Sequence, residues 1–156
     1  MTKLEALQKL KKYCAYQERS HSEVRTKLIS LQVYGLTLEE VILELVQEDY
    51  LNEERFARAY ARGKHRIKKW GRGKIKQGLK LKRVSDYCIK KAMTEIDPDQ
   101  YVLTLHEILT KYYTLRKDKY DSYTMQLKLV NHAVSKGYEY HLSKSHAQAI
   151  LSHEDC

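Results

Sequence analysis

Apolar side chains recur along the chain at the three- and four-residue spacing of an amphipathic helix. Leu4, Leu7 and Leu10 form the first of these stripes, and Phe56, Tyr60 and Ile67 form a later one. No segment shows the sustained apolar–polar alternation that is expected of a half-buried strand. The pattern therefore predicts an all-α protein with about nine helices, at residues 2–17, 21–34, 38–48, 53–67, 72–81, 86–95, 98–115, 120–135 and 140–151.

Residues that commonly begin helices stand just before several of these stripes. Ser20 and Glu23 have the spacing of a capping box, in which two side chains satisfy free backbone N–H groups, and so do Thr37 and Glu40. Simple N-caps are expected at Asn52, Ser85 and Asp97, with Pro98 at the first helical position. Apolar pairs of the hydrophobic-staple type flank four of the caps: Leu36 with Val41, Leu51 with Phe56, Val84 with Ile89, and Ile96 with Tyr101.

The predicted helices group in threes. Corresponding turns recur after about 45 to 54 residues, a period that is typical of a tandem array of helical units. The pattern predicts three tandem three-helix repeats that form an elongated, curved array. Repeat 1 would cover residues 1–50, the basic repeat 2 residues 51–96, and repeat 3 residues 97–156 with a short C-terminal tail.

Composition narrows the class of protein further. With one proline and six glycines, the chain has few breaks between helices. Cys14, Cys88 and Cys156 are far apart and show no CxxC spacing, which favours a reducing compartment over a disulfide framework. No apolar run approaches the ~20 residues of a membrane span, and the N-terminus lacks a secretory signal. We therefore expect a cytoplasmic protein that does not contact a membrane.

The charges are unevenly distributed along a chain of net charge +9. Residues 38–54 contain seven acids and no base, whereas residues 62–83, named here the basic run, contain eleven Lys or Arg and no acid. Such a field attracts polyanions or an acidic protein surface. Trp70 lies within the run and either covers the core at a helix junction or stacks on a partner. The candidate binding residues are Arg62, Lys64, Arg66, Lys68, Lys69, Arg72, Lys74, Lys76, Lys80, Lys82 and Arg83.

Motifs for other chemistries are weak. The stretch Gly71–Lys74 lacks the first glycine and the final Ser or Thr of a phosphate loop and follows a helix, so we expect a helix–helix turn there. His141 and His146 are five residues apart and do not share the helix face that paired metal ligands need. None of the cysteines lies in a recognisable nucleophile context. We expect no catalytic residue, cofactor, metal or small-molecule substrate, and hence no enzyme.

Three stretches of the chain match the pattern of a known family. Residues 19–28, RSHSEVRTKL, are similar to its Ser-x-x-Glu-Leu-Arg-x-Lys-Leu segment. Residues 49–60, DYLNEERFARAY, are similar to Gly-Tyr-Leu-Asp-Asp-x-Arg-Phe-Ala-x-x-Phe, and Gly71, Ile75 and Leu79 follow its Gly-x-x-x-Ile-x-x-x-Leu spacing. Asp49 and Arg83 stand where the family commonly has glycine. The chain resembles the RecX family, small bacterial regulators of the RecA recombinase, over about residues 4–95. The C-terminal third matches mainly in helix spacing and in Lys136-Gly137-Tyr138.

The resemblance implies a fold and a function. The fold would be three tandem three-helix repeats, with Phe56, Ala57, Tyr60, Ile75 and Leu79 in packing positions. The protein would bind in the groove of the RecA–DNA filament and damp ATP hydrolysis, strand exchange and co-protease activity in recombination and SOS repair. Separately from the resemblance, we expect a monomer. Its partners would be the RecA filament and the DNA phosphate backbone within or beside it. The alternative is a helical module that binds DNA or RNA without sequence preference.

Overall fold

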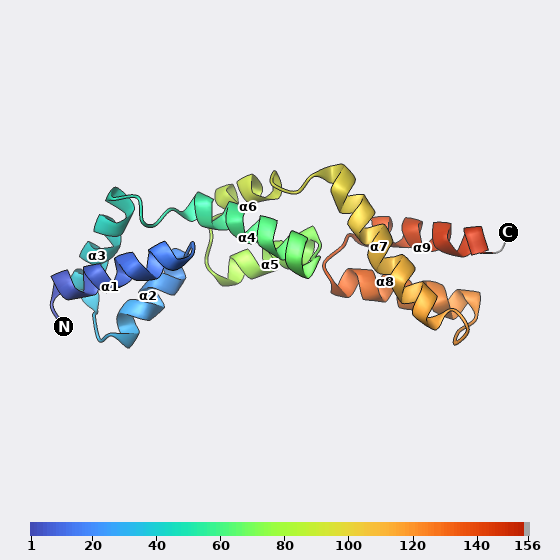
Figure 1. Cartoon of the computed structure of the whole chain (residues 1–156), viewed down its shortest axis with the longest axis horizontal. Helices are drawn as coiled ribbons and strands as arrows, with labels where there is room; N and C mark the ends of the chain where they lie inside the picture. The colour runs from blue at the N-terminus through green and yellow to red at the C-terminus, as the bar shows by residue number, and fades with distance from the viewer. Residues whose placement is uncertain (155–156) are drawn as a thin grey trace. The chain divides into compact units, whose positions relative to one another are not determined.

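The computed structural model describes residues 1–154, which form helices joined by short turns and contain no strand (Figure 1). In chain order the helices are α1 (Lys3–Tyr16), α2 (His21–Ser30), α3 (Gly35–Gln47), α4 (Glu53–Lys68), α5 (Arg72–Leu81), α6 (Asp86–Met93), α7 (Pro98–Arg116), α8 (Ser122–Ser135) and α9 (Tyr140–Glu154). The prediction of an all-α protein with tandem groups of helices is confirmed. Cys156, in the predicted C-terminal tail, lies outside the described residues.

Several helices begin at the side chains that the sequence predicts. The Ser20 hydroxyl accepts a hydrogen bond from the backbone N–H of Glu23 at 3.0 Å. The Glu23 carboxylate accepts from the Ser20 hydroxyl at 3.3 Å, so Ser20 is a cap but the reciprocal half of the predicted capping box is not formed. The other confirmed caps accept the N–H three residues further on, with donor–acceptor distances of 2.9 Å at Asn52, 3.3 Å at Ser85 and 2.9 Å at Asp97. Thr2 and Glu5 form a complete capping box that the sequence analysis did not identify. These caps satisfy backbone N–H groups that have no partner within their own helix.

The start of α3 differs from the prediction. The helix begins at Gly35, so Thr37 lies inside it and does not cap it. Val33 is only 4% exposed, whereas Leu36, the expected staple partner of Val41, is 75% exposed. Because Val33 anchors the chain in the core before α3, the helix begins ahead of Thr37.

A second correction concerns the inner face of α4. The sequence pattern places Ile67 on the apolar stripe of this helix, but its side chain is 76% exposed. The buried positions are Phe56, Ala57, Ala61 and His65, and the last three of them are spaced by four residues. His65 therefore takes the inward position near the end of α4, and Ile67 lies on the solvent side.

The helices belong to two compact units. Unit 1 comprises Met1–Ala61 and Gly78–Glu95, and unit 2 comprises Arg62–Gln77 and the chain from Ile96 onward. Helices α4 and α5 thus contribute residues to both units. The predicted repeat boundaries near residues 50 and 96 stay a prediction.

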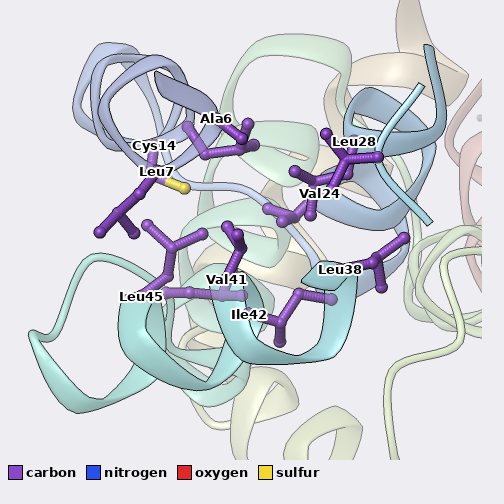
Figure 2. Packing of buried hydrophobic residues seen from close by; sticks show 12 residues of the cluster. Ala6, Leu7, Cys14, Val24, Leu28, Leu38, Val41, Ile42 and Leu45 are labelled. Carbon is purple, nitrogen blue, oxygen red and sulfur yellow. The ribbon is translucent and has the colours of Figure 1, made fainter. Parts of the chain in front are cut away.

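The core of unit 1 includes a cluster where α1, α2 and α3 face one another. Figure 2 shows Leu38, Val41 and Leu45 of α3 directed toward side chains of the other two helices. The cluster consists of Ala6, Leu7, Leu10, Cys14, Val24, Leu28, Val33, Leu38, Val41, Ile42, Leu45 and Leu51. Removing a Leu side chain of this kind from water contributes about 1.5–3 kcal/mol to folding.

Hydrogen bonds and ion pairs attach the rest of unit 1 to this cluster. The Nε of Arg55 lies 2.7 Å from a carboxylate oxygen of Glu18. The Nζ of Lys82 lies 3.2 Å from Glu23. Surface pairs of this kind contribute little stability one by one.

Unit 2 is built on α7, α8 and α9, which contact one another. Its buried side chains include Tyr101, Leu105, Leu109, Met125, Leu129, Ala133, Tyr138, Ala147 and Ile150. The chain segment 62–77 adds His65 and Ile75 to the buried set. The tyrosines matter most for the site, because both make contacts with residues of the basic run.

Candidate functional site

The basic run begins on the last turns of α4, in unit 2. Arg66, Lys68 and Lys69 are exposed there. The helix ends at Lys68 because Lys69 has a backbone φ of 58°, in the left-handed region that an α-helix cannot continue. Cations near a helix C-terminus also complement the negative end of the helix dipole. The end of α4 therefore presents several positive charges to solvent.

The run continues along α5 and the turn that follows it. Lys76 is exposed in unit 2, and Lys80 and Arg83 are exposed in unit 1. Among all eleven candidates, the exposed ones are Arg62, Arg66, Lys68, Lys69, Lys76, Lys80 and Arg83. The other four, Lys64, Arg72, Lys74 and Lys82, are partly buried. Both units thus carry part of the predicted binding surface.

Trp70 is the aromatic centre of the run. The ammonium groups of Lys64 and Lys74 lie 4.9 and 4.8 Å from the centroid of its ring. A cation at this distance from an indole is attracted by the electron-rich ring face. The carbonyl oxygen of Trp70 also lies 3.0 Å from Nδ1 of the buried His65. The tryptophan therefore holds two lysines of the run within unit 2.

Arg72 has a packing role in addition to its charge. Its guanidinium carbon lies 3.9 Å from the ring centroid of Tyr101, and its NH1 lies 2.7 Å from a carboxylate oxygen of Glu139. The backbone N–H of Arg72 donates to the Tyr101 hydroxyl at 3.0 Å. Tyr101 is 1% exposed. Arg72 thus covers a core residue of unit 2, and replacing it would disturb the fold as well as the surface charge.

Burial and hydrogen bonding fix the protonation states of this network. Burial raises the pKa of Tyr101, and the carboxylate of Glu139, which accepts a hydrogen bond from the Tyr101 hydroxyl, raises it further. Burial also tends to raise the pKa of Glu139, but hydrogen bonds from Tyr101 and Arg72 outweigh it and hold that pKa below its ordinary value. At neutral pH the tyrosine is therefore a donor and the glutamate an ionised acceptor.

The glycines of the basic run serve a close crossing of two backbone segments in unit 2. The N–H of Gly71 donates to the carbonyl of Lys136 at 2.7 Å, and the N–H of Gly73 donates to the carbonyl of Gly137 at 2.9 Å. A Cβ on Gly71 would lie 2.3 Å from the carbonyl carbon of Gly137. The N–H groups that a phosphate loop would offer to a nucleotide are therefore already used.

Sequence reasoning did not connect Arg72 with Tyr101 and Glu139, because the partners are 29 and 67 residues away from it. No local pattern pairs residues at such distances. The one signal was the Lys136-Gly137-Tyr138 stretch, which matches the RecX pattern and precedes Glu139 directly. The family pattern thus pointed to the segment that contacts Arg72, although it did not identify Arg72 as the partner.

The surroundings of the buried cysteines do not favour nucleophilic chemistry. Burial raises the pKa of the Cys14 thiol to about 11 and also raises that of Cys88. A thiol that stays protonated is a poor nucleophile. Within residues 1–154, no three His, Cys, Asp or Glu side chains are grouped so as to hold a metal ion. None of the helices in that range combines the length and the apolar character that crossing a membrane requires.

Comparison with known proteins gives a consistent result. Residues 52–93 match the family model described as RecX, second three-helix domain. The regulatory protein RecX of Clostridium perfringens (strain SM101 / Type A) is 30% identical over 137 residues, which are 87% of this chain and 64% of that protein. RecX of Streptococcus uberis is 26% identical over 133 residues, 85% of this chain and 50% of that protein. The chain thus spans about half to two thirds of the length of these relatives.

Solved structures agree with the sequence comparisons on the fold. The crystal structure of RecX from Lactobacillus salivarius superposes with a TM-score of 0.84 and 23% identity, over 94% of this chain and 95% of that one. A second RecX crystal structure gives a TM-score of 0.82 over 90% of this chain. Together with the matched domain and the related sequences, these likenesses confirm the resemblance that the motifs carry. The matched domain, the related sequences and the shared fold together support the RecX family as the one to which this chain is related.

Proposed function

We propose that this protein regulates the RecA recombinase by binding to the RecA–DNA filament. The single observation that carries the proposal is the exposed part of the basic run on α4 and α5, in a chain related to the RecX family. A filament of protein on DNA offers both phosphates and carboxylates to such a surface. Exposed lysines and arginines neutralise phosphates and release counterions, which favours binding without sequence preference.

Binding in the filament groove would oppose the changes that a working filament undergoes. We propose inhibition of ATP hydrolysis, strand exchange and co-protease activity as its result, with the protein acting as a monomer in the cytoplasm. The protein itself would perform no catalysis, in keeping with the name of its relatives, which are regulatory proteins. Its inhibition of RecA would follow from its binding in the filament groove alone.

A second candidate function rests on the same residues. Exposed cations on both α4 and α5 would also suit a helical module that binds DNA or RNA backbone by itself. In that case any effect on RecA would arise from competition for nucleic acid. The two functions differ in whether the filament, rather than bare DNA, is the preferred target.

An ATPase assay separates the two functions. We would measure RecA-catalysed, DNA-dependent ATP hydrolysis against increasing concentrations of this protein, first at limiting DNA and then in a large excess of DNA. Binding to the filament predicts dose-dependent inhibition that survives the excess. Inhibition that disappears when DNA is added would support the second function and contradict the first.

A charge-reversal variant tests the basic run. Arg66→Glu, Lys68→Glu and Lys76→Glu change three exposed side chains and avoid Arg72, which packs on Tyr101. We expect the concentration for half-maximal inhibition to rise about tenfold or more. The slope of the logarithm of the binding constant against the logarithm of the salt concentration should become less negative by about one for each lost phosphate contact. The melting temperature should change little, because exposed charges contribute little stability.

The matched control carries Lys9→Glu, Lys12→Glu and Lys144→Glu. These lysines are also exposed and lie outside the basic run. Their substitution lowers the net charge of +9 by the same six units as the charge-reversal variant. The control should inhibit RecA nearly as well as the unmodified protein. An equal loss of RecA inhibition in both variants would mean that the total charge of the protein, and not the basic run, governs binding.

A further inference from the structure

A pocket of about 410 Å³ opens on unit 2 beside α7 and α8. Lys111 and Arg116 of α7 line it together with Lys136 at the end of α8 and Lys69 from the end of the α4 segment. Glu107 is the one acidic residue in its lining. Three of these four basic residues lie outside the basic run, and the proposed function does not use them.

The positive charges of this pocket are only partly balanced by the described residues that line it. Within residues 1–154, no carboxylate forms an ion pair with Lys69, Lys111, Arg116 or Lys136. Four cations against one carboxylate leave a surplus of three positive charges around one small space. Like charges that share a pocket repel one another, and a bound anion relieves that repulsion.

Contacts around the pocket hold several of these groups in place. The Arg116 guanidinium carbon lies 4.0 Å from the ring centroid of Tyr112, and this ring lies 4.7 Å from that of His132. Stacking of this kind orients the flat guanidinium fork, which matches the oxygens of a phosphate group. The pocket thus has a fixed aromatic wall with a planar cation on it.

The backbone at Lys69 is also held in an unusual conformation. Its φ of 58° is in the left-handed region that costs a residue with a Cβ free energy. The hydroxyl of the buried Tyr138 donates to the Lys69 carbonyl at 2.9 Å and retains this conformation. The same left-handed conformation also follows α2, α3 and α5, at Gln32, Asp49 and Arg83, so its role here is to fix where the backbone places Lys69. Here the strained residue is one of the four cations of the pocket.

We propose that this pocket binds a phosphate group of an anionic ligand. Arg116 supplies a planar fork, and Lys69, Lys111 and Lys136 supply point charges. The phosphate comes either from a nucleic acid backbone or from a free nucleoside triphosphate, because both present the same oxygens to these donors. The inference goes beyond the proposed function, since it concerns α7 and α8 and requires no RecA.

His132 provides a reporter inside the pocket. Burial lowers the pKa of this imidazole, and the charges of Lys136 and Arg116 lower it further. The other polar or titratable groups that line the pocket are Lys69, Lys111, Glu107 and Tyr112. A bound phosphate adds negative charge near the ring and favours its protonated form. The pKa of His132 should therefore rise when the pocket is occupied.

The test uses the full chain, pyrophosphate as the probe and no RecA. Calorimetry measures binding, while NMR follows the imidazole signals of His132 against pH. We expect saturable binding and a higher His132 pKa in the presence of pyrophosphate. ATP and a short oligodeoxythymidine then compete with the probe, and the one that displaces it identifies the source of the phosphate. No binding, an unchanged His132 pKa, or no displacement by either competitor would overturn the proposal.

Paired variants separate the pocket from general charge. Lys111→Gln with Lys136→Gln should weaken pyrophosphate binding about tenfold or more, because each lost charge-assisted contact is strong. Lys117→Gln with Lys119→Gln removes the same charge from exposed positions outside the pocket and should leave binding unchanged. Circular dichroism confirms that both variants fold. Equal weakening in the two variants would show attraction by net charge alone and reject the pocket.

Discussion

Gly71 lies where two backbone segments of unit 2 meet, and its missing side chain allows the approach. Gly71→Ala would place a Cβ 2.3 Å from the carbonyl carbon of Gly137, where backbone and not a flexible side chain must move. We expect this substitution to lower the free energy of unfolding by about 1–3 kcal/mol or more. Urea unfolding followed by circular dichroism measures the change.

Gly63 is the matched control for this prediction. It lies inside α4, and a Cβ there would meet no heavy atom within 4 Å. Gly63→Ala should raise the free energy of unfolding by about 0.5–1 kcal/mol, because alanine has the higher helix propensity. The prediction fails if both substitutions change stability in the same direction by similar amounts.

Single backbone positions also show why the RecX pattern has glycine at two places where this chain does not. Asp49 and Arg83 stand where the family commonly has glycine, and their φ values are 62° and 60°. Glycine adopts this left-handed conformation without the steric cost that a Cβ brings. The family pattern thus identified turn positions correctly. It could not reveal the packing of Arg72, because that role depends on Tyr101 and Glu139 in distant parts of the chain.

Helix α4 combines a buried face with an exposed one, and a single substitution on each face tests this. Phe56 is 5% exposed and its ring centroid lies 5.8 Å from that of Tyr60. Phe56→Ala should lower the free energy of unfolding by about 3–5 kcal/mol, because it removes buried surface and leaves a cavity. Chemical denaturation of the purified variant provides the measurement.

Ile67→Ala, on the same helix, is the control for this face assignment. Its side chain is 76% exposed, so the substitution should change the free energy of unfolding by no more than about 0.5 kcal/mol. A large loss from Ile67→Ala would place this residue in an interface or in the core. A small loss from Phe56→Ala would assign the ring to the surface.

Helix periodicity and caps predicted the elements well, and the errors have a physical cause. Ser20, Asn52, Ser85 and Asp97 cap as expected, since a cap depends on residues within three positions of one another. The start of α3 depends instead on whether Val33 or Leu36 enters the core. That choice is made by contacts with other helices, which the local sequence does not contain.

The charge pattern of the whole chain was the most informative feature for the predicted surface, but it could not show which side chains are available. The density of Lys and Arg along the sequence predicted the basic run. The structure then showed that Arg66 and Lys76 are exposed, whereas Arg72 packs on Tyr101. The pocket of unit 2 could not be predicted in the same way. Lys69 and Lys111 are far apart in sequence, and only the fold brings them to one space.

Acid should destabilise the protein through two histidines of unit 2 before its carboxylates titrate. Burial lowers the pKa of His132 and of His146, with further lowering by Lys136 and Arg116 at the first and by His106 at the second. The unfolded chain therefore binds more protons than the folded one between the folded pKa values and about 6.5. Stability rises with pH across this window and falls as the pH drops through it.

Glu53 and Glu139 cannot produce this effect, because their pKa shifts act in a lower pH range. The pKa values of Glu53 and Glu139 lie below the ordinary value of 4.5, so their contribution is lost only in more acidic solution. We expect urea unfolding to show lower stability at pH 5.5 than at pH 7.5, and His132→Asn with His146→Asn to reduce that difference. If the free energy of unfolding of the double variant falls by the same amount between pH 7.5 and pH 5.5, other groups bind the extra protons on unfolding.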